Sequence, residues 1–373
     1  MDQSKKVLQF IDSLDPGGAE SLVIDLSLGL QDLGMDVTVG HFGNPWLAER
    51  CQNEGIPQAI IRGHRWYKSS VTLPWFIFSF SKYLRSNQFS AVHAHLYGAT
   101  VAAAIAGRLS GIPVVGTLHD AYTLTERPSR IHLLQLAAFS GAQLVSVAQY
   151  MERLFRTMGR FNSAAWQTIP NGIDTERFYP RQTGNDLAAA RTNAGLPTGG
   201  PLIGSVGRLV PLKRFNELIE AFSRSEISAH LVIIGDGPER PELERLIQQR
   251  GVTEKVHLLG QRSDISSLLP LLDLFALWSE TEGLSCSIAE AMSCGLPSLV
   301  SDVGGNRELI EQDSSGILVP ADATDQLVAY LQTLCSDEQQ RNRLGNAARL
   351  RIEHHYSHTE MINNYAGLLS KPT

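Results

Sequence analysis

Short apolar runs alternate with amphipathic helical segments along almost the whole chain, and this alternation restarts once. The first apolar run, Val7–Ile11, ends in the turn residues Asp15 to Gly18, and leucines then recur at helical spacing. Such alternation is typical of a parallel sheet covered by helices on both faces. In the first series we predict four strands, namely Val7–Ile11, Val37–Val39, Ala91–Ala94 and Val114–Leu118.

The second series begins after a Gly- and Pro-rich stretch. We therefore predict two doubly wound α/β domains, residues 1–180 and 198–355, joined by a linker at 181–197. A helix at about 356–373 is expected to cross back to the first domain. Because ligands of such sheets bind beyond the carboxyl ends of the strands, we expect a site shared by the two domains. The six predicted strands of the second domain are Leu202–Val206, Leu231–Ile234, Val256–Leu259, Leu274–Leu277, Ser298–Ser301 and Ile317–Val319.

The net charge of the chain argues against one class of partner, nucleic acid, and its distribution differs between the two halves of the sequence. The 373 residues carry a formal net charge of −6, whereas a dedicated nucleic-acid binder is usually basic, so we expect no nucleic-acid partner. The charge is uneven, at +2 over residues 1–185 and −8 over residues 186–373. The two halves are therefore expected to meet different partners.

The cysteines and the hydropathy favour a cytoplasmic protein. The four cysteines, Cys51, Cys286, Cys294 and Cys335, form no C-x-x-C pair, which suits a reducing compartment. The N-terminal apolar stretch is too short for a signal peptide. No apolar run reaches the roughly 18–20 residues that a membrane span needs.

The first domain offers an anion-binding turn and a titratable pair. Gly17 and Gly18 follow the first strand and open a helix, where backbone N–H groups attract an anion. The alternative is an ordinary tight turn between strand and helix. His119 and Asp120 end another strand, where they serve either in catalysis or in structure.

His93 and His95 lie two residues apart, on one face of a predicted strand. This spacing can bind zinc, but no Asp, Glu or Cys ligands accompany the pair, so we predict no metal site.

The second domain offers cations at the end of its first strand. Arg208 and Lys213 suit a diphosphate leaving group, on which negative charge develops during reaction. The alternative is a solvated basic loop. A dinucleotide fingerprint is absent at Gly235-Asp236-Gly237-Pro238-Glu239-Arg240, which disfavours NAD.

Two glutamates follow a later strand of the second domain. Glu282 is expected in a loop before Gly283, and Glu290 in the first turns of a helix capped by Ser285 or Ser287. Carboxylates accept hydrogen bonds from neighbouring hydroxyls, so the two could hold two polyols of one ligand. The alternative for Glu290 is a favourable charge near a helix N-terminus.

Taken in order, these motifs resemble those of the retaining glycosyltransferases of family four, which have the GT-B fold of two Rossmann-like domains facing across a cleft. The resemblance covers nearly the whole chain. The order and spacing of these motifs together are more specific than any single motif. The absence of an Asp-x-Asp sequence agrees with the metal independence of this class. The matching motifs are Gly17-Gly18-Ala19-Glu20, Val92-His93-Ala94-His95, Leu118-His119-Asp120, Pro170-Asn171-Gly172-Ile173-Asp174, Gly207 to Lys213, Gly235-Asp236-Gly237-Pro238, Glu282 to Glu290 with Ala291-Met292, and Val303-Gly304-Gly305 with Glu308.

The resemblance implies transfer of a sugar, with retention, from a nucleotide sugar held mainly by the second domain. Arg208 and Lys213 would hold the diphosphate, and Glu290 the ribose hydroxyls. Glu282, with the backbone of the following residues, would take the donor-sugar hydroxyls. His119 would lie beside that sugar, with Asp120 orienting it. The remaining expected contacts are Gly283, Leu284, Ser285 and Cys286 with the sugar, and Gly17 and Gly18 with the phosphates and the anomeric centre.

The resemblance leaves the substrates open. Arg214 stands where the family usually has Gly, and Ser285-Cys286 replaces the commoner small-and-aliphatic pair. No cofactor is expected besides the donor substrate, with a UDP-sugar favoured over a GDP-sugar. The acceptor would be a glycan, a lipid-linked glycan or a small molecule. The alternatives are a sugar-nucleotide epimerase and a non-catalytic nucleotide-sugar-binding subunit.

Residues 66–85 raise the question of membrane contact. A helix there would turn a core face of Leu73, Phe76, Ile77, Phe80 and Leu84 toward the sheet. Its other face carries aromatic and basic residues. The simpler interpretation is that these aromatics are buried too, and the alternative is peripheral contact with a membrane. That second face carries Trp75, Phe78, Lys82 and Arg85.

Overall fold

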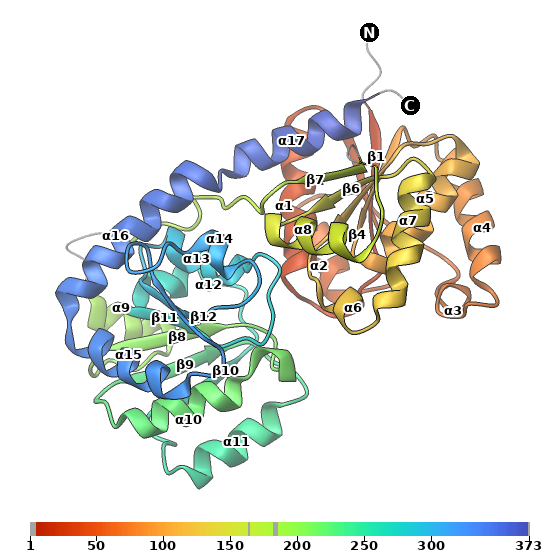
Figure 1. Ribbon diagram of the computed structural model, residues 1–373. Helices are drawn as coiled ribbons and strands as arrows, with labels where there is room; N and C mark the ends of the chain where they lie inside the picture. The colour runs from red at the N-terminus through yellow and green to blue at the C-terminus, as the bar shows by residue number, and fades with distance from the viewer. Residues whose placement is uncertain (1–4, 163–164, 182–185, 372–373) are drawn as a thin grey trace. The chain divides into compact units, whose positions relative to one another are not determined.

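The computed structural model describes residues 5–162, 165–181 and 186–371 (Figure 1). The chain divides into two compact units. The first unit consists of Met1–Gly172 together with Thr359–Thr373, and the second of Ile173–His358. The chain therefore passes between the units at residues 172–173 and 358–359.

The stretch expected to be a linker, residues 181–197, differs from that expectation. Residues 182–185 lie outside the described residues, and helix α9 (Leu187–Ala194) belongs to the second unit. The side chain of Arg191 in this helix is buried and pairs with Asp273 at 2.6 Å. This ion pair fixes α9 to the second unit, which a flexible linker would not show.

In the described part of the first unit, seven strands form one sheet in the order β3-β2-β1-β4-β5-β6-β7, with parallel pairing throughout. The strand order reverses between β1 and β4, and the carboxyl ends beside such a reversal are where doubly wound sheets bind ligands. All four strands predicted from the sequence are confirmed, and β3, β6 and β7 are additions. The strands are β1 (Lys6–Ile11), β2 (Asp36–His41), β3 (Gln58–Ile60), β4 (Ala91–His95), β5 (Val114–Leu118), β6 (Gln143–Ser146) and β7 (Trp166–Thr168).

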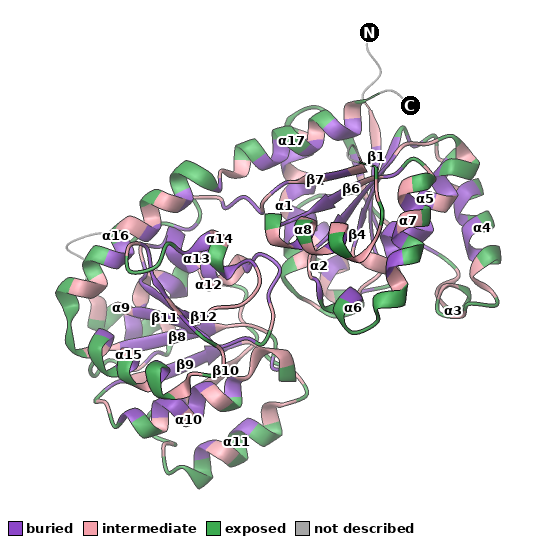
Figure 2. Ribbon diagram, viewed as in Figure 1, coloured by how far each residue is buried: buried purple, intermediate pink, exposed green. Residues whose placement is uncertain are grey.

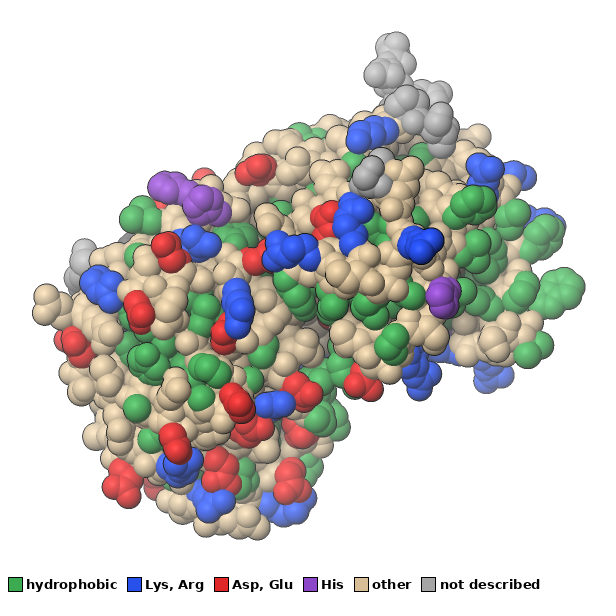
Figure 3. Space-filling model, in the orientation of Figure 1, with side chains coloured by type: hydrophobic (Ala, Val, Ile, Leu, Met, Phe, Trp, Pro, Cys, Tyr) green, Lys and Arg blue, Asp and Glu red, His purple; other side chains and the backbone are tan. Residues whose placement is uncertain are grey.

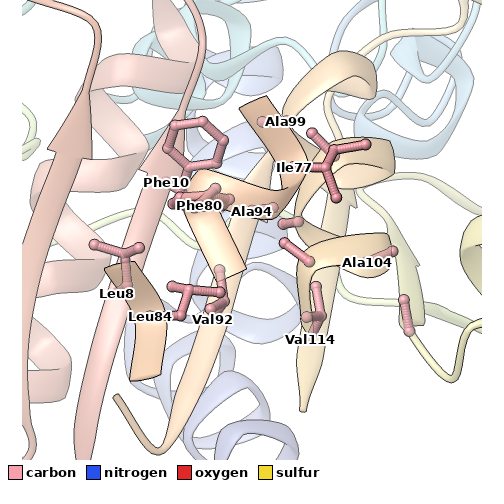
Figure 4. Close-up of a cluster of buried hydrophobic side chains, with 14 of the residues drawn as sticks. Leu8, Phe10, Ile77, Phe80, Leu84, Val92, Ala94, Ala99, Ala104 and Val114 are labelled. Atoms are coloured by element: carbon pink, nitrogen blue, oxygen red, sulfur yellow. The ribbon is translucent and has the colours of Figure 1, made fainter. Parts of the chain in front are cut away.

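Both faces of this sheet are buried (Figure 2). Successive side chains of a strand point to opposite faces, so Leu8 and Phe10 pack on one side and Val7 on the other. Figure 4 shows the first side, where Leu8 and Phe10 belong to one buried cluster with Ile77, Phe80 and Leu84 of α4. This burial on two faces explains the nearly continuous apolar runs of the sequence.

The C-terminal helix α17 (His358–Ser370) packs on the second side of the sheet, beside α1 (Gly18–Asp32). Gly29 of α1 leaves the room that Ile362 of α17 occupies, since a Cβ on Gly29 would lie 2.0 Å from the Ile362 side chain. The other helices of the first unit are α2 (Pro45–Asn53), α3 (His64–Tyr67), α4 (Leu73–Ser86), α5 (Tyr97–Ser110), α6 (Tyr122–Thr125), α7 (Ile131–Phe139) and α8 (Gln149–Met158).

The exposed face of α4 corrects the simpler interpretation of residues 66–85. Trp75 and Phe78 are 69% and 53% exposed, so they are not extra core residues. The core face of the helix is as expected, with Phe76, Ile77, Phe80 and Leu84 buried and Leu73 partly buried. The helix packs on the sheet through that one stripe, which leaves the opposite stripe without cover from the described residues of its own unit.

In the described part of the second unit, six parallel strands form one sheet in the order β10-β9-β8-β11-β12-β13, so the order reverses between β8 and β11. All six predicted strands are confirmed. They are β8 (Leu202–Val206), β9 (His230–Ile234), β10 (Val256–Gly260), β11 (Leu274–Leu277), β12 (Ser298–Ser301) and β13 (Ile317–Val319).

Helices again separate most of these strands. Among the helices in the described part of the chain, none combines the length and the apolar character needed to cross a membrane. Besides α9, the helices of the second unit are α10 (Phe215–Ser225), α11 (Arg240–Gln249), α12 (Ile265–Leu268), α13 (Cys286–Ser293), α14 (Asn306–Leu309), α15 (Thr324–Ser336) and α16 (Glu338–His355).

Candidate active site

Polar side chains line one face of the first sheet beside its reversal of strand order. Gln9, His93, His95 and Thr117 are fully buried in β1, β4 and β5. They share the face that carries Val7, because each lies an even number of residues from an apolar neighbour on that side. Buried polar groups usually have hydrogen-bond partners. In this row Nε2 of Gln9 and Nδ1 of His93 have none among the described residues, and the other side-chain polar atoms are paired. We call the row and the residues bonded to it the polar network.

The network reaches His119 through His95. Nε2 of His95 lies 2.7 Å from Oε1 of Gln9, and Nδ1 of His95 lies 3.1 Å from Nε2 of His119. Since an amide oxygen only accepts, His95 donates from Nε2 and its Nδ1 accepts the proton of His119 Nε2. His119 is thereby held as the tautomer whose Nδ1 is an acceptor.

A second branch joins the C-terminal helix to the same network. Nε2 of His93 lies 2.8 Å from Oγ1 of Thr117, which lies 3.1 Å from the hydroxyl of Tyr365 in α17. The ring of His93 also contacts the ring of His95, with centroids 4.0 Å apart. The two histidines first considered as zinc ligands are therefore hydrogen-bonded to protein side chains.

The histidines of this network are neutral at pH 7. Burial lowers the pKa of His119 to about 4 and that of His93 to about 3, and it lowers the pKa of His95 well below its usual value. The neighbouring imidazoles add to the effect for His93 and His95. His119 can therefore exchange hydrogen bonds with a ligand, but it does not offer a positive charge.

Asp120 follows His119 and stabilises the next short helix. Its Oδ1 accepts a hydrogen bond from the backbone N–H of Thr123, 3.2 Å away. Asp120 is partly exposed at the carboxyl end of β5, as the sequence predicts. Orientation of His119 by Asp120 stays a prediction.

The segments that follow β1 and β4 have unusual local backbone features, a tightly packed glycine after β1 and a strained residue after β4. Gly17 is extended, and a Cβ there would lie 2.9 Å from a carboxylate oxygen of the buried Glu20. Gly18 is the first residue of α1, so the helix begins where the motif predicts. After β4, Leu96 has φ +74° and ψ 164°, a conformation that costs a non-glycine residue about 1–3 kcal/mol and that often marks functional sites.

Asp12, directly after β1, was not predicted from the sequence. Its carboxylate accepts a hydrogen bond from the hydroxyl of Tyr67, which lies on α3. Burial raises the pKa of both groups, while the hydrogen bond to Tyr67 opposes the increase at Asp12. Gly98 makes room for this pair, since a Cβ there would overlap both side chains.

In the second unit, Lys213 and Glu282 meet beside the reversal of strand order. Nζ of Lys213 lies 2.6 Å from Oε1 of Glu282, and the Glu282 residue is only 8% exposed. The same oxygen accepts a hydrogen bond from Ser279 at 2.5 Å. Lys213 comes from the loop after β8 and Glu282 from the loop after β11, so the ion pair joins the two strands at which ligands of this fold bind.

Two glycines after β9 bring a third loop against the loop after β8. A Cβ on Gly235 would lie 2.0 Å from the carbonyl oxygen of Gly207, and one on Gly237 would lie 2.4 Å from that of Leu209. The motif therefore has a packing role, which is to hold the backbone around Arg208. The side chain of Arg208 is exposed on that loop.

The segment after Glu282 forms the start of α13. Gly283, Leu284 and Ser285 are buried, Ser285 is the N-cap, and Cys286 is the first helical residue. Ser285 does not cap the helix with its side chain, which lies 3.2 Å from the hydroxyl of Ser287 instead. Glu290 lies within the second turn of α13, as predicted.

The structure thus gives direct side-chain contacts for some of the predicted residues. In the second unit it joins Lys213 and Glu282 directly, and in the first it joins His119 to His95. Among the described residues, no group of three or more His, Cys, Asp and Glu side chains is arranged to hold a metal ion. The network residues that sequence reasoning missed share one signal, a polar residue inside an apolar strand or helix pattern: Gln9, Thr117, Ser279 and Tyr365.

Comparison with known protein families gives two matches in chain order. Residues 16–177 match the family model Glycosyltransferase Family 4, and residues 188–351 match the model Glycosyl transferases group 1. Each model covers most of one of the two units described above.

Two relatives illustrate the similarity. Over 275 residues the chain is 30% identical to the UDP-Gal:alpha-D-GlcNAc-diphosphoundecaprenol alpha-1,3-galactosyltransferase of Escherichia coli, covering 70% of each protein. Over 258 residues it is 25% identical to the N-acetyl-alpha-D-glucosaminyl L-malate synthase of Bacillus anthracis. That match covers 68% of this chain and 66% of the relative, slightly under two thirds of its length.

Among solved structures, the chain is similar to HepE of Anabaena in complex with UDP-glucose. The TM-score is 0.86 at 24% sequence identity, and the match covers 98% of this chain and 99% of the other. With the two parallel-sheet units, this likeness confirms the expected GT-B fold.

Proposed function

Since this chain belongs to the glycosyltransferases of family four, we propose that it transfers a sugar from a nucleoside-diphosphate sugar to a glycan or lipid-linked glycan, with retention of the anomeric configuration. Glycosyltransferase is the enzyme class of the family. UDP is the favoured nucleotide of the donor. The name of the E. coli relative, which begins with UDP-Gal, supports that choice.

The ion pair of Lys213 and Glu282 is the observation that carries this proposal. It sets a cation and a hydrogen-bond acceptor side by side at the carboxyl ends of β8 and β11. A nucleotide sugar needs both, because its diphosphate is anionic and its sugar hydroxyls donate hydrogen bonds. Negative charge grows on the diphosphate as the sugar leaves, so a cation there stabilises the transition state more than the ground state.

The other residues of the second unit complete the donor site in this proposal. Arg208 joins Lys213 at the diphosphate, so that two protein cations supply charge there and we assign no step to a metal ion. Glu290 takes the ribose hydroxyls. Glu282 takes the sugar hydroxyls, together with the backbone of the residues that begin α13: Gly283, Leu284, Ser285 and Cys286.

The first unit supplies the remaining proposed roles. His119, neutral and held by His95, is proposed to exchange a hydrogen bond with the donor sugar, with Asp120 positioning the chain around it. Gly17 and Gly18 allow close approach of the phosphates and the anomeric centre. A cytoplasmic location is part of the proposal, which the four free cysteines support.

A thermal-shift titration tests the donor site first. We expect UDP and UDP-sugars to raise the melting temperature at lower concentration than GDP, AMP or NAD. The Glu290→Ala variant should need at least tenfold more UDP for the same shift, whereas Glu254→Ala, an exposed glutamate of the same unit, should match the wild type.

Transfer is then measured with the nucleotide sugar that binds best and a set of lipid-linked and soluble glycan acceptors. Retention is read from the anomeric coupling constant of the product. If no nucleotide binds, or if Glu290→Ala binds as tightly as the wild type, the donor-site assignment is wrong. Turnover of the donor without any acceptor would instead favour epimerisation.

A further inference from the structure

Exposed apolar side chains cluster on the segment that includes α3 and α4. Trp66 is 49% exposed, Val71 81%, Trp75 69% and Phe78 53%. Figure 3 shows hydrophobic side chains gathered on the side of the first unit where α4 lies, with Lys and Arg at their edges. We call this surface the α3–α4 face and define it by those four residues and the cations described next.

The same part of the chain lacks acidic residues entirely. Residues 55–119 contain six Lys and Arg and no Asp or Glu, although the whole chain has a net charge of −6. All six cations are exposed, and in the described part of the chain none of them forms an ion pair with a carboxylate. They are Arg62, Arg65, Lys68, Lys82, Arg85 and Arg108.

The aromatic and basic residues of α4 lie along one stripe. Trp75, Phe78, Lys82 and Arg85 are spaced three, four and three residues apart, which places them on one face of the helix. Nζ of Lys82 lies 4.6 Å from the centre of the Phe78 ring. Long basic side chains can therefore reach from an apolar layer to charged groups above it.

We propose that the α3–α4 face binds the surface of an anionic lipid bilayer, with the helix axis lying along the membrane. Tryptophan and phenylalanine insert at the level of the headgroups, and each Lys or Arg near an anionic surface contributes about 1 kcal/mol. The absence of carboxylates from residues 55–119 favours an anionic plane over a protein partner, whose interface would mix both signs of charge.

The segment also connects to the candidate active site of its unit. Tyr67 on α3 donates its hydrogen bond to Asp12, at the carboxyl end of β1. Binding of α3 and α4 to a bilayer would thus place the acceptor side of that site close to a lipid-linked acceptor. The binding itself goes beyond the proposed sugar transfer and does not depend on it, because it is measured without any nucleotide sugar.

Vesicle flotation tests the proposal. The full-length protein is mixed at low salt with vesicles of phosphatidylcholine alone, or of phosphatidylcholine with phosphatidylglycerol. We expect flotation only with the anionic vesicles, and its loss at high salt. On binding, the emission of the exposed Trp66 and Trp75 should shift to the blue, which needs no variant.

Two variants and two controls locate the contact. Trp75→Ser with Phe78→Ser, and Lys82→Glu with Arg85→Glu, should each lower the partition coefficient at least tenfold. Tyr179→Ser and Arg245→Glu change an exposed aromatic and an exposed cation of the second unit, and they should bind like the wild type. Circular dichroism checks that each variant is folded.

Three outcomes would overturn the proposal. The first is no flotation of the wild type with anionic vesicles at low salt. The second is an equal loss of binding in the control variants. The third is a dimer in light scattering that Trp75→Ser with Phe78→Ser dissociates, without vesicle binding, since the face would then serve a second copy of the chain.

Discussion

Lys213 and Glu282 form a partly buried ion pair. We expect Lys213→Ala to lower kcat/KM for transfer at least about tenfold, because a charged hydrogen bond contributes roughly 1.5–3 kcal/mol. The loss should appear mainly in kcat if the cation acts on the departing diphosphate. Initial rates over a range of donor concentrations measure it, with Lys255→Ala, an exposed lysine of the same unit, as the control.

A double substitution separates catalysis from stability at this pair. Lys213→Ala removes the cationic donor of the Glu282 carboxylate and leaves the hydrogen bond from Ser279, which should lower the free energy of unfolding by about 1–3 kcal/mol. Lys213→Ala with Glu282→Gln should regain much of that stability without regaining transfer. Urea unfolding of the four proteins measures the coupling. Recovery of transfer in the double variant would contradict a direct role for either charge.

The buried histidines make the stability of the first unit depend on pH. An unfolded histidine binds a proton below its usual pKa of 6.5, whereas folded His93 stays neutral down to a pKa of about 3. Between these values the unfolded state holds more protons, so stability is complete above pH 6.5 and falls as the pH decreases. Each such group contributes up to about 1.4 kcal/mol per pH unit. The pKa of His119, lowered to about 4, changes the stability with pH in the same direction.

We therefore expect the free energy of unfolding to fall from pH 7 to pH 5, and to fall less steeply in His93→Gln. Glutamine keeps a side-chain donor toward Thr117 but does not titrate. Urea unfolding at pH 7, 6 and 5 measures both slopes. His355→Gln removes an exposed histidine and should leave the slope unchanged. An unchanged slope in His93→Gln would mean that His93 is protonated alike in both states.

The sequence predicted where the candidate residues lie on strands, loops and helices better than it predicted the contacts among them. Lys213, Glu282 and Glu290 lie where the motifs place them, at strand and helix ends. The contact of Lys213 with Glu282 spans 69 residues and depends on β8 pairing with β11, which no local pattern reveals. The link between His95 and His119 depends in the same way on the register of β4 and β5.

The residue directly before helix α10 has an unfavourable backbone conformation. Arg214 has φ 44° and ψ 42°, in the left-handed region that glycine adopts without strain. This is the position at which the family usually has Gly. The guanidinium lies 3.5 Å from Glu280 and 3.6 Å from Glu217, and such contacts contribute little where the acidic partners are exposed to solvent.

Comparing two substitutions at Arg214 isolates the backbone strain. Arg214→Gly and Arg214→Ala both remove the guanidinium, but we expect the Gly variant to be more stable by roughly 0.5–1 kcal/mol. Urea unfolding measures the difference. Arg245 lies inside α11 and serves as the control. There Arg245→Ala should be more stable than Arg245→Gly, because Ala is about 1 kcal/mol more favourable than Gly within a helix. If the Ala variant were the more stable one at both positions, backbone strain at Arg214 would be contradicted.

At the scale of elements, ten of the strands were predicted from apolar runs, whereas β3, β6 and β7 of the first sheet were missed. The strands that lie between two others in both sheets were identified, except β6, which lies between β5 and β7. Strands β3 and β7 are three residues long at the edges of the first sheet, which is too short for a period to appear. The exposed Trp75 and Phe78 were misjudged for a different reason, since hydrophobicity alone does not distinguish a core from a surface that binds a partner.

The whole molecule contains two units, each with its own core, and the last helix of the chain completes the first core. Helix α17 packs on β1, β4 and β5 across nearly the full length of the sequence. Its buried residues contribute to the cluster that includes Val7 and Val115. They are Met361, Ile362, Tyr365, Leu368 and Leu369.

Tyr365→Ala should therefore lower the stability of the first unit and leave that of the second unchanged. The side chain is fully buried and its hydroxyl lies 3.1 Å from Thr117, so its removal should lower the free energy of unfolding by about 3–5 kcal/mol. Hydrogen exchange with mass spectrometry should show lost protection in β4 and β5 and unchanged protection in β8 and β11. Tyr179→Ala, at an exposed tyrosine of the second unit, should change neither. Equal loss of protection in both sheets would mean that the two units unfold as one cooperative body.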